Sequence, residues 1–346
     1  LISLFIVNKS LNTIIAENNE VLIKGSNIDF ILRLLKKADK KNAPKIVINK
    51  DRSKSIIYKK NNYQKTLSQR ELLYLIKNPE SYLYEEKFIK ETLNFLYSKL
   101  PVYQRQGVEA YKKDINNIKH LCKYINNPQN KLKFIHIGGT NGKGSTAKIL
   151  CNVLQKQKLK VGLYTSPHYF DFRERIQINN NKIEKVFITK FIAKILPIIN
   201  KIQPSFFEVT VALSLYYFYK KKVDLAIIEV GLGGRLDSTN IIKPIISVIT
   251  NVSLDHTNLL GNSVKKIATE KAGIIKKETP IIIGREQKEI KNIFINKAKK
   301  EKSKLIFAKK YNIKITPKYQ KENANTVISI LKLMIEKGYK INLNKI

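Results

Sequence analysis

The stretch 136-HIGGTNGKGST-146 carries four glycines and one lysine between an apolar run and a segment with helical character. The preceding residues 131–137 read as a short buried strand, and from Ser145 to Leu154 apolar residues recur at helical spacing. A strand, a glycine-rich loop and a helix in this order let backbone N–H groups and a helix N-terminus bind phosphate. The stretch therefore predicts a phosphate-binding loop.

Two side-chain types add to this prediction. Lys143 would bring a positive charge to the phosphates, and Ser145 or Thr146 a hydroxyl for a magnesium ion. The spacing departs from the commonest phosphate-loop pattern because Gly144 stands between the lysine and the hydroxyl residues. A glycine-rich turn without a ligand is the alternative interpretation, and a kinase, a helicase or a ligase could each use such a loop.

With 346 residues the chain is long enough for two domains, or for one large α/β domain with an extension. No apolar run approaches the ~18 residues that cross a bilayer, and no secretion signal is evident, so we expect a cytoplasmic protein without a membrane partner. The first residue, Leu1, indicates a fragment or an unusual start. The two cysteines, Cys122 and Cys151, are expected to be free thiols in a reducing compartment.

The formal net charge of +38 would ordinarily favour a nucleic-acid partner. Of the 65 basic residues, however, only eight are arginine, and the lysines are spread along the whole chain together with abundant Ile and Asn. A nucleic-acid binder more often gathers Arg and aromatic residues on one face. We therefore expect no specific nucleic-acid partner, although nonspecific polyanion binding at low salt is a by-product of the charge.

The chain changes character along its length. Residues 1–85 contain short β-like runs, at 21–24, 45–49 and 55–58, around an amphipathic helix at 28–37, and they carry no chemical motif. Helices are predicted at 88–99 and 114–125, and beyond the phosphate loop strands alternate with helices. The predicted strands are 161–165, 224–230, 245–250, 280–284 and 304–308, and the predicted helices 186–200, 206–220, 263–273 and 289–301. This alternation predicts an α/β fold with a doubly wound, mostly parallel sheet.

In a parallel sheet ligands bind at the carboxyl ends of the strands, and polar residues follow several of the predicted ones. Ser166 follows the first strand after the loop, Glu229 closes the next, and Asp255 and His256 come after the one beyond it. A carboxylate in the position of Glu229 can order a magnesium ion opposite a phosphate loop. His256 is a plausible ligand of a second ion, although Mg²⁺ prefers oxygen. Taken singly, each residue has the ordinary explanation of a turn or a helix cap.

In combination, several segments resemble one family, that of folylpolyglutamate synthase/dihydrofolate synthase, an ATP-dependent amide ligase of the Mur ligase type. The segments are GTNGKGST (139–146), YTSPH (164–168), FRERI (172–176), EVGLGGRLDSTN (229–240), TNVSLDH (250–256), LLG (259–261) and EKAGIIK (270–276). The resemblance covers residues 86–346 and is specific as a set. It implies a Mur-ligase-like ATP-binding domain.

The resemblance assigns roles to matching positions. The phosphate loop would bind ATP through Gly139, Thr140, Asn141, Gly142, Lys143, Gly144, Ser145 and Thr146, with Asn323 at a nucleotide-contacting position. Ser166, Glu229 and His256 would be magnesium ligands, and Lys143, Lys271 and His256 the catalytic residues, with Lys271 carbamylated so that it helps to bind metal. Gln104 and Arg105 in 101-PVYQRQG-107, together with Arg235 and Asp237, would contact the pterin substrate.

The implied reaction belongs to folate biosynthesis and one-carbon metabolism. The carboxylate of dihydropteroate or folate would attack the γ-phosphorus of ATP to give an acyl phosphate, and the amine of L-glutamate would displace phosphate. Positioning and charge neutralisation carry such a reaction, and ATP and Mg²⁺ are the implied cofactors. No protein nucleophile is required.

Two departures from the family lead to expectations about domains. Residues 1–85 correspond to nothing in the family and are expected to be an extension of unknown role, followed by the ATP-binding domain at 86–318. Residues 319–346 resemble the start of the connection to a C-terminal domain that the chain lacks. The protein is therefore expected to be a monomer or to need a separate C-terminal domain. The alternatives are a truncated or split ligase half that binds nucleotide without full activity, and a P-loop ATPase acting on nucleic acid; EVGLGGRLDST favours the ligase.

Overall fold

The computed structural model describes residues 89–98, 100–101 and 114–343, and in the N-terminal part the backbone of six short strands. The chain divides into two compact units, residues 1–88 and 89–346. The described part of the first unit consists of two antiparallel three-stranded sheets. One contains β1 (Phe5–Asn8), β2 (Thr13–Ala16) and β3 (Asn19–Val21), and the other β4 (Lys45–Ile48), β5 (Lys54–Tyr58) and β6 (Tyr63–Leu67). The helix predicted at 28–37 lies outside the described residues.

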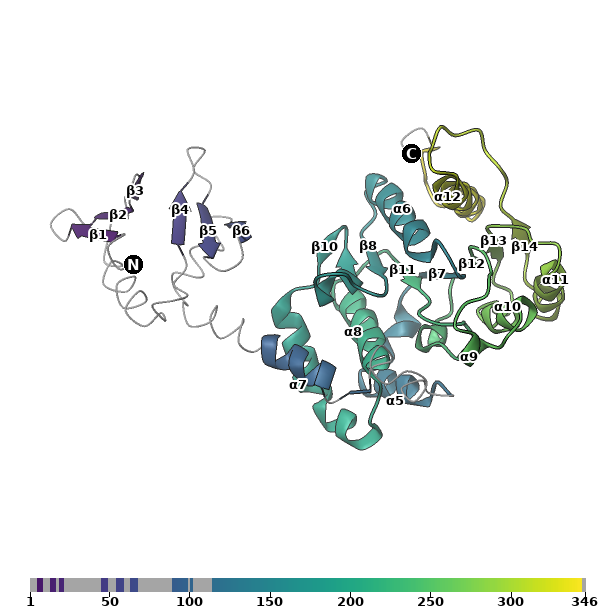
Figure 1. Cartoon of the computed structure of the whole chain (residues 1–346), viewed down its shortest axis with the longest axis horizontal. Helices are drawn as coiled ribbons and strands as arrows, with labels where there is room; N and C mark the ends of the chain where they lie inside the picture. Colours follow the sequence, from purple (N-terminus) through teal and green to yellow (C-terminus); the bar gives the residue numbers. More distant parts are fainter. Residues whose placement is uncertain are drawn as a thin grey trace. The chain divides into compact units, whose positions relative to one another are not determined.

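The second unit is built on an eight-stranded sheet in the order β10-β9-β8-β11-β7-β12-β13-β14 (Figure 1). Its strands are β7 (Phe134–Gly138), β8 (Val161–Tyr164), β9 (Ile176–Ile178), β10 (Asn181–Lys182), β11 (Leu225–Glu229), β12 (Ile246–Ile249), β13 (Ile281–Ile283) and β14 (Leu305–Phe307). Six of them run parallel, whereas β9 pairs antiparallel with β8 and with β10. The expected α/β fold with a mostly parallel sheet is confirmed.

The central strands are apolar on both faces because helices cover both faces of the sheet. Ile135 and Ile137 of β7 pack into one hydrophobic cluster with α6 (Lys143–Lys156) and α12 (Lys318–Glu336). Phe134, from the same strand, packs into another cluster with α5 (Asn116–Tyr124), α7 (Lys185–Ile202) and α8 (Phe206–Lys220). Side chains that alternate along one strand thus fill two separate cores, one on each face of the sheet.

The far end of the sheet has a core of its own, in which β12, β13 and the helices α10 (Val264–Ala272) and α11 (Lys291–Lys300) meet. A short helix, α9 (Thr257–Leu260), precedes α10. The five strands and four helices predicted beyond the phosphate loop therefore all exist. No helix of the described residues is long and apolar enough to span a bilayer.

The antiparallel edge formed by β9 and β10 was not predicted from the sequence. These strands have three and two residues, and the turn between them contains Asn179 and Asn180, both with positive φ. Strands this short give no periodic pattern; β9 is recognised by its pairing with β8, and β10 by its pairing with β9.

Candidate functional site

The glycine-rich loop joins the end of β7 to the start of α6. Gly139 and Gly142 have φ values of 134° and 80°, in the region that favours glycine. Gly142 is the N-cap of α6, so the backbone N–H groups of the first helical turn face the loop. This is the strand, loop and helix arrangement that binds phosphate, as expected for residues 139–146.

The loop is held in place by the segment that follows β12. The Thr140 N–H donates to the Asn251 carbonyl at 2.8 Å, and the Asn141 N–H donates to the Asn251 side-chain oxygen at 3.1 Å. The Thr250 hydroxyl donates to the Asn141 carbonyl at 2.7 Å, and the Ser253 N–H donates to the Thr140 hydroxyl at 3.1 Å. The loop is thereby fixed in shape before any ligand binds, which lowers the entropic cost of binding.

Two lysines bond to the carbonyls of this loop. Lys143 Nζ donates to the Thr140 carbonyl at 2.9 Å, and Lys271 Nζ donates to the Gly139 carbonyl at 2.8 Å. Lys271 is only 3% exposed, and its burial, together with the nearby charge of Lys143, lowers its pKa to about 8. The structure thus brings Lys143 and Lys271 together across the loop, although they are far apart in sequence.

Glu229 lies beside the start of α6 at the end of β11. A Cβ placed on Gly144 would be 3.4 Å from one of its carboxylate oxygens, and Glu229 also accepts the Ser166 N–H at 3.0 Å. Its side chain is buried, and this burial raises its pKa to about 7 even though Lys143 and Arg175 act in the opposite direction. The result is an acidic group facing the phosphate loop, with Ser166 next to it.

The segment after Glu229 is folded around Asp237. This buried carboxylate accepts the Leu232 N–H at 2.8 Å and the Thr239 N–H at 2.9 Å, and it caps the 3-10 helix η5 (Ser238–Ile241). Burial raises the pKa of Asp237, while these hydrogen bonds favour its charged form. Arg235, by contrast, is mostly exposed and forms a two-pronged ion pair with Glu270.

The position of His256 is described by its neighbours along the chain. It caps the N-terminus of α9 with a φ of 46°, and its ring lies 3.5 Å from the carboxylate of Asp255. It follows β12, at the same edge of the sheet as Glu229. Among the described residues no group of three or more His, Cys, Asp and Glu side chains is arranged to hold a metal ion. The structure therefore joins Ser166 and Glu229 directly.

Asn323 reaches the phosphate loop from α12. A Cβ on Gly142 would lie 2.3 Å from its side-chain oxygen, and the Thr146 hydroxyl donates to that oxygen at 3.5 Å. Near the start of the same helix, a hollow of about 500 Å³ is lined by Arg285, Lys318, Tyr319 and Glu322. Asn323, the predicted nucleotide residue, thus approaches the phosphate loop from the helix whose first turns line the hollow.

Arg175, a buried arginine in the segment FRERI whose charge acts to lower the pKa of Glu229, was not singled out from the sequence. Arg175 donates to His168 Nδ1 at 2.7 Å and lies 5.3 Å from the centre of the Phe206 ring. His168 Nε2 lies 3.0 Å from the Tyr97 hydroxyl. What distinguishes Arg175 is that its charged side chain is buried, and burial cannot be read from a single sequence.

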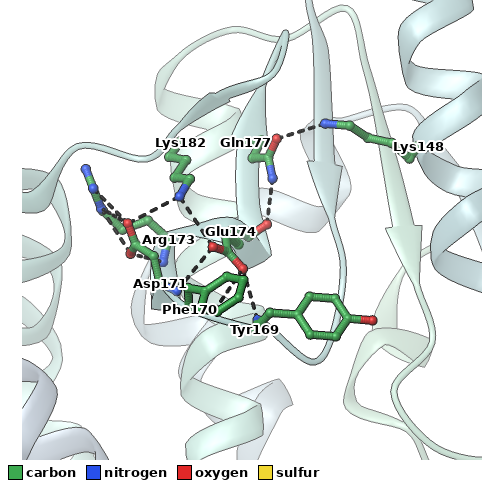
Figure 2. A network of polar contacts seen from close by, with 8 residues as sticks. All are labelled: Lys148, Tyr169, Phe170, Asp171, Arg173, Glu174, Gln177 and Lys182. Atoms are coloured by element: carbon green, nitrogen blue, oxygen red, sulfur yellow. Dashed lines mark hydrogen bonds and ion pairs between the residues drawn. The ribbon is translucent and has the colours of Figure 1, made fainter. Parts of the chain in front are cut away.

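The segment between His168 and Arg175 is held by its own polar network (Figure 2). Glu174 accepts the backbone N–H groups of Tyr169 and Asp171 at 2.9 and 3.2 Å, and Lys182 pairs with both carboxylates. Tyr169 and Phe170 are 86% and 97% exposed. This loop, held by its own hydrogen bonds, therefore exposes two aromatic rings to solvent.

Some of the predicted site residues thus lie together in the structure, and others do not. Lys143, Gly144, Glu229, Ser166 and Lys271 lie around one phosphate loop. Arg235 faces Glu270 rather than the carboxylates of the site. Gln104 and Arg105 lie outside the described residues.

The second unit of the chain matches a known protein family. Residues 137–345 match the Mur ligase middle domain. The chain is 38% identical over 196 residues to dihydrofolate synthase/folylpolyglutamate synthase of Bacillus subtilis, a match that covers 55% of this chain and 46% of that protein. The chain spans less than half the length of the curated relatives it matches.

Solved structures show the same likeness. The crystal structure of folylpolyglutamate synthase from Thermotoga maritima has a TM-score of 0.66 and 32% identity, and the match covers 75% of this chain and 65% of that one. E. coli FolC in complex with DHPP and ADP has a TM-score of 0.65 and 26% identity, over 74% of this chain and 64% of that one. With its phosphate loop, the buried Glu229 and the matched residues, the chain belongs to the Mur ligase middle-domain family, in its folylpolyglutamate synthase/dihydrofolate synthase group.

Proposed function

We propose that the protein is an ATP-dependent ligase that joins L-glutamate to the carboxylate of dihydropteroate or folate through an acyl phosphate. The observation that carries this proposal is the position of Glu229, a buried carboxylate beside the first turn of α6. Acyl-phosphate chemistry needs a phosphate cradle and opposed charges that are fixed in place, and it needs no protein nucleophile. The matched relatives carry the names of this activity.

ATP would bind with its phosphates on the loop and its nucleoside toward α12. The N–H groups at the start of α6 and the ammonium of Lys143 would hold the phosphates. Asn323 lies against Gly142, and Arg285 and Tyr319 line the hollow near the start of α12, so this hollow is the place we propose for the base and ribose. The complex of E. coli FolC with ADP supports a nucleotide in this family.

The residues around the loop fit a magnesium ion, which the reaction would use to neutralise phosphate charge. Mg²⁺ takes one or two protein oxygens and completes its shell with water and phosphate oxygens, so a crowded cluster of side chains is not needed. Glu229 and the hydroxyl of Ser166 are the oxygen donors we propose, with Ser145 or Thr146 on the loop side. His256 would be an outer partner at most, because nitrogen is the poorer ligand for this ion.

Lys271 is suited to the carbamylation that we propose for it. Carbon dioxide reacts with the neutral amine, and burial lowers the pKa of Lys271 to about 8, so a substantial share of the amine is neutral near that pH. The added carboxylate would turn toward the cation at the loop. Mass spectrometry of the folded protein with and without bicarbonate would detect the modification, and Lys271→Met would serve as the control.

The pterin acid would enter along the segment after Glu229. Asp237 and Arg235 belong to this segment, and Phe207 packs closely against it, because a Cβ on Gly231 would lie 2.4 Å from the Phe207 ring. In this position the substrate carboxylate would face the phosphates, and the fixed loops would exclude water from the acyl phosphate. Gln104 and Arg105 complete the proposed substrate residues.

The test is glutamate incorporation by the purified chain with ATP, Mg²⁺, dihydropteroate and isotopically labelled L-glutamate, followed by mass spectrometry. Incorporation that requires ATP, and that Lys143→Ala removes, would support the proposal. Lys148→Ala is the matched control, because Lys148 lies further along α6 and bonds to Gln177. Incorporation that survives Lys143→Ala would show that the loop is not the phosphate site, and no incorporation at all would contradict a ligase activity of this chain by itself.

A further inference from the structure

His136 stands in the middle of β7, the strand that leads into the phosphate loop. Its neighbours Ile135 and Ile137 are apolar, and all three side chains are fully buried. Burying a histidine in a central strand costs free energy unless its polar atoms are bonded. Here only one is: Nε2 lies 2.8 Å from the Thr239 hydroxyl, whereas Nδ1 has no hydrogen-bond partner among the described residues.

The hydrogen atoms of this contact can be assigned from the neighbouring groups. The Thr239 hydroxyl has one hydrogen, and it donates to the Asp237 carboxylate at 2.5 Å. Burial raises the pKa of Asp237, but backbone N–H groups point at both of its oxygens, and these hydrogen bonds favour the ionised, accepting form. Thr239 must then accept from His136, so the proton of the neutral ring is on Nε2.

The protonation of His136 itself is not variable. Complete burial and the nearby charge of Lys276 lower its pKa to about 3, so the ring is neutral throughout the range in which an enzyme works. The Nε2–H group of the neutral ring therefore remains a hydrogen-bond donor throughout this pH range. The order of donation is then His136 to Thr239 to Asp237.

Asp237 also bonds to the loop that follows Glu229. It accepts the Leu232 N–H, and a Cβ on Gly231 would lie 3.1 Å from its carboxylate. Gly231 and Leu232 are the second and third residues after Glu229. The chain of hydrogen bonds therefore ties the strand that ends in the phosphate loop to the segment proposed to hold the pterin acid.

We propose that His136 is a positioning residue, which holds Asp237 through the Thr239 hydroxyl and so fixes residues 231–237 in the shape that binds the acid substrate. This inference rests on the proposed function. Core stability gives no reason for histidine at this position, because an aliphatic side chain would fill the strand without leaving a buried nitrogen unbonded. The advantage of histidine must then lie in its hydrogen bond to Thr239, which orients Asp237.

The first test measures the proton position without any substrate. The chain contains four histidines, so a two-dimensional ¹⁵N spectrum of the full-length protein has few ring signals, and His136→Leu identifies those of His136. The expected result is a neutral ring with the proton on Nε2, unchanged between pH 6 and 8. A proton on Nδ1 would reverse the direction of the hydrogen bonds and overturn the proposal.

The second test separates substrate from nucleotide binding. Thr239→Val keeps the volume but removes the hydroxyl, and it should weaken dihydropteroate binding about tenfold, as expected for one lost hydrogen bond, with ATP binding unchanged. Thr239→Ser should restore binding because it restores the hydroxyl. Thr210→Val is the matched control, since Thr210 is equally buried but bonds to the Phe206 carbonyl.

Each result has one meaning. Equal dihydropteroate binding by Thr239→Val and wild type, or equal losses for dihydropteroate and ATP, would overturn the positioning role. If His136→Leu fails to fold, the Thr239 series alone decides. If the wild type binds ATP but no dihydropteroate, the proposed substrate is wrong, and the substrate role of His136 is overturned with it, whereas the ring proton still shows whether the hydrogen-bond chain exists.

Discussion

Replacing Glu229 by glutamine should make the unliganded protein more stable at pH 8 while it impairs the proposed reaction. Glu229 is 4% exposed, and its burial raises its pKa from 4.5 to about 7. At pH 8 the folded protein therefore carries a buried negative charge that the unfolded chain would keep in water. Glutamine has the same shape and can still accept the Ser166 N–H, but it carries no charge.

The size of the effect follows from the pKa. Each pKa unit corresponds to about 1.4 kcal/mol, so the rise from 4.5 to about 7 corresponds to about 3 kcal/mol of lost stability at pH 8. Because the folded pKa is the higher one, the stability that the protonated group provides is fully present below about pH 4.5 and is lost as the pH rises through about 7. For a compact unit of the size of residues 89–346, the glutamine variant should melt about 6–12 °C higher at pH 8.

Thermal unfolding followed by far-UV circular dichroism, in EDTA and without nucleotide, measures this difference; the chain has no tryptophan to report by fluorescence. The advantage of Glu229→Gln should shrink as the pH falls from 8 to 5. Glu174→Gln is the matched control with the opposite sign, because backbone N–H groups lower the pKa of Glu174 and favour its charge. A variant no more stable than wild type at pH 8, or an advantage independent of pH, would refute the reasoning.

Three other substitutions or reactions test separate parts of the site. Lys143→Ala should still fold but lose the stabilisation by ATP, which at a hundredfold excess over the dissociation constant is about 2.7 kcal/mol in the wild type; an unchanged stabilisation by ATP would remove Lys143 from the phosphate site. Gly142→Ala should destabilise the protein by about 1–3 kcal/mol, measured by urea unfolding, because its φ is 80° and the new Cβ would clash with Asn323; a neutral effect would mean that the loop relaxes freely. Cys122 and Cys151 should resist iodoacetamide at pH 8 in the folded protein, since burial raises the pKa of both thiols, to about 12 and about 11; rapid labelling before unfolding would contradict their burial.

The succession of strands and helices along the chain and the position of the phosphate loop were predictable from the sequence. Both depend on local patterns: apolar runs of strand length, helical spacing from Ser145 onward, and glycines where positive φ is needed. The place of Glu229 beside the phosphate loop was also predictable, because a carboxylate that closes a strand of a parallel sheet lies at the edge where ligands bind. The rule that parallel strands gather their carboxyl ends at one edge then predicted its neighbours.

The tertiary structure alone decided which of these residues touch. Thr239 meets His136 across 103 positions, and Lys271 meets Gly139 across 132. The order of strands that brings β11 and β12 to either side of β7 is set by packing on two faces at once, and no periodic pattern records it. Burial is likewise a property of the whole fold: the lowered pKa of Lys271 and the raised pKa of Glu229 arise because distant segments exclude water from them. The sequence by itself determined the kinds of groups present and their place on the strands, whereas their contacts and their protonation depend on long-range packing.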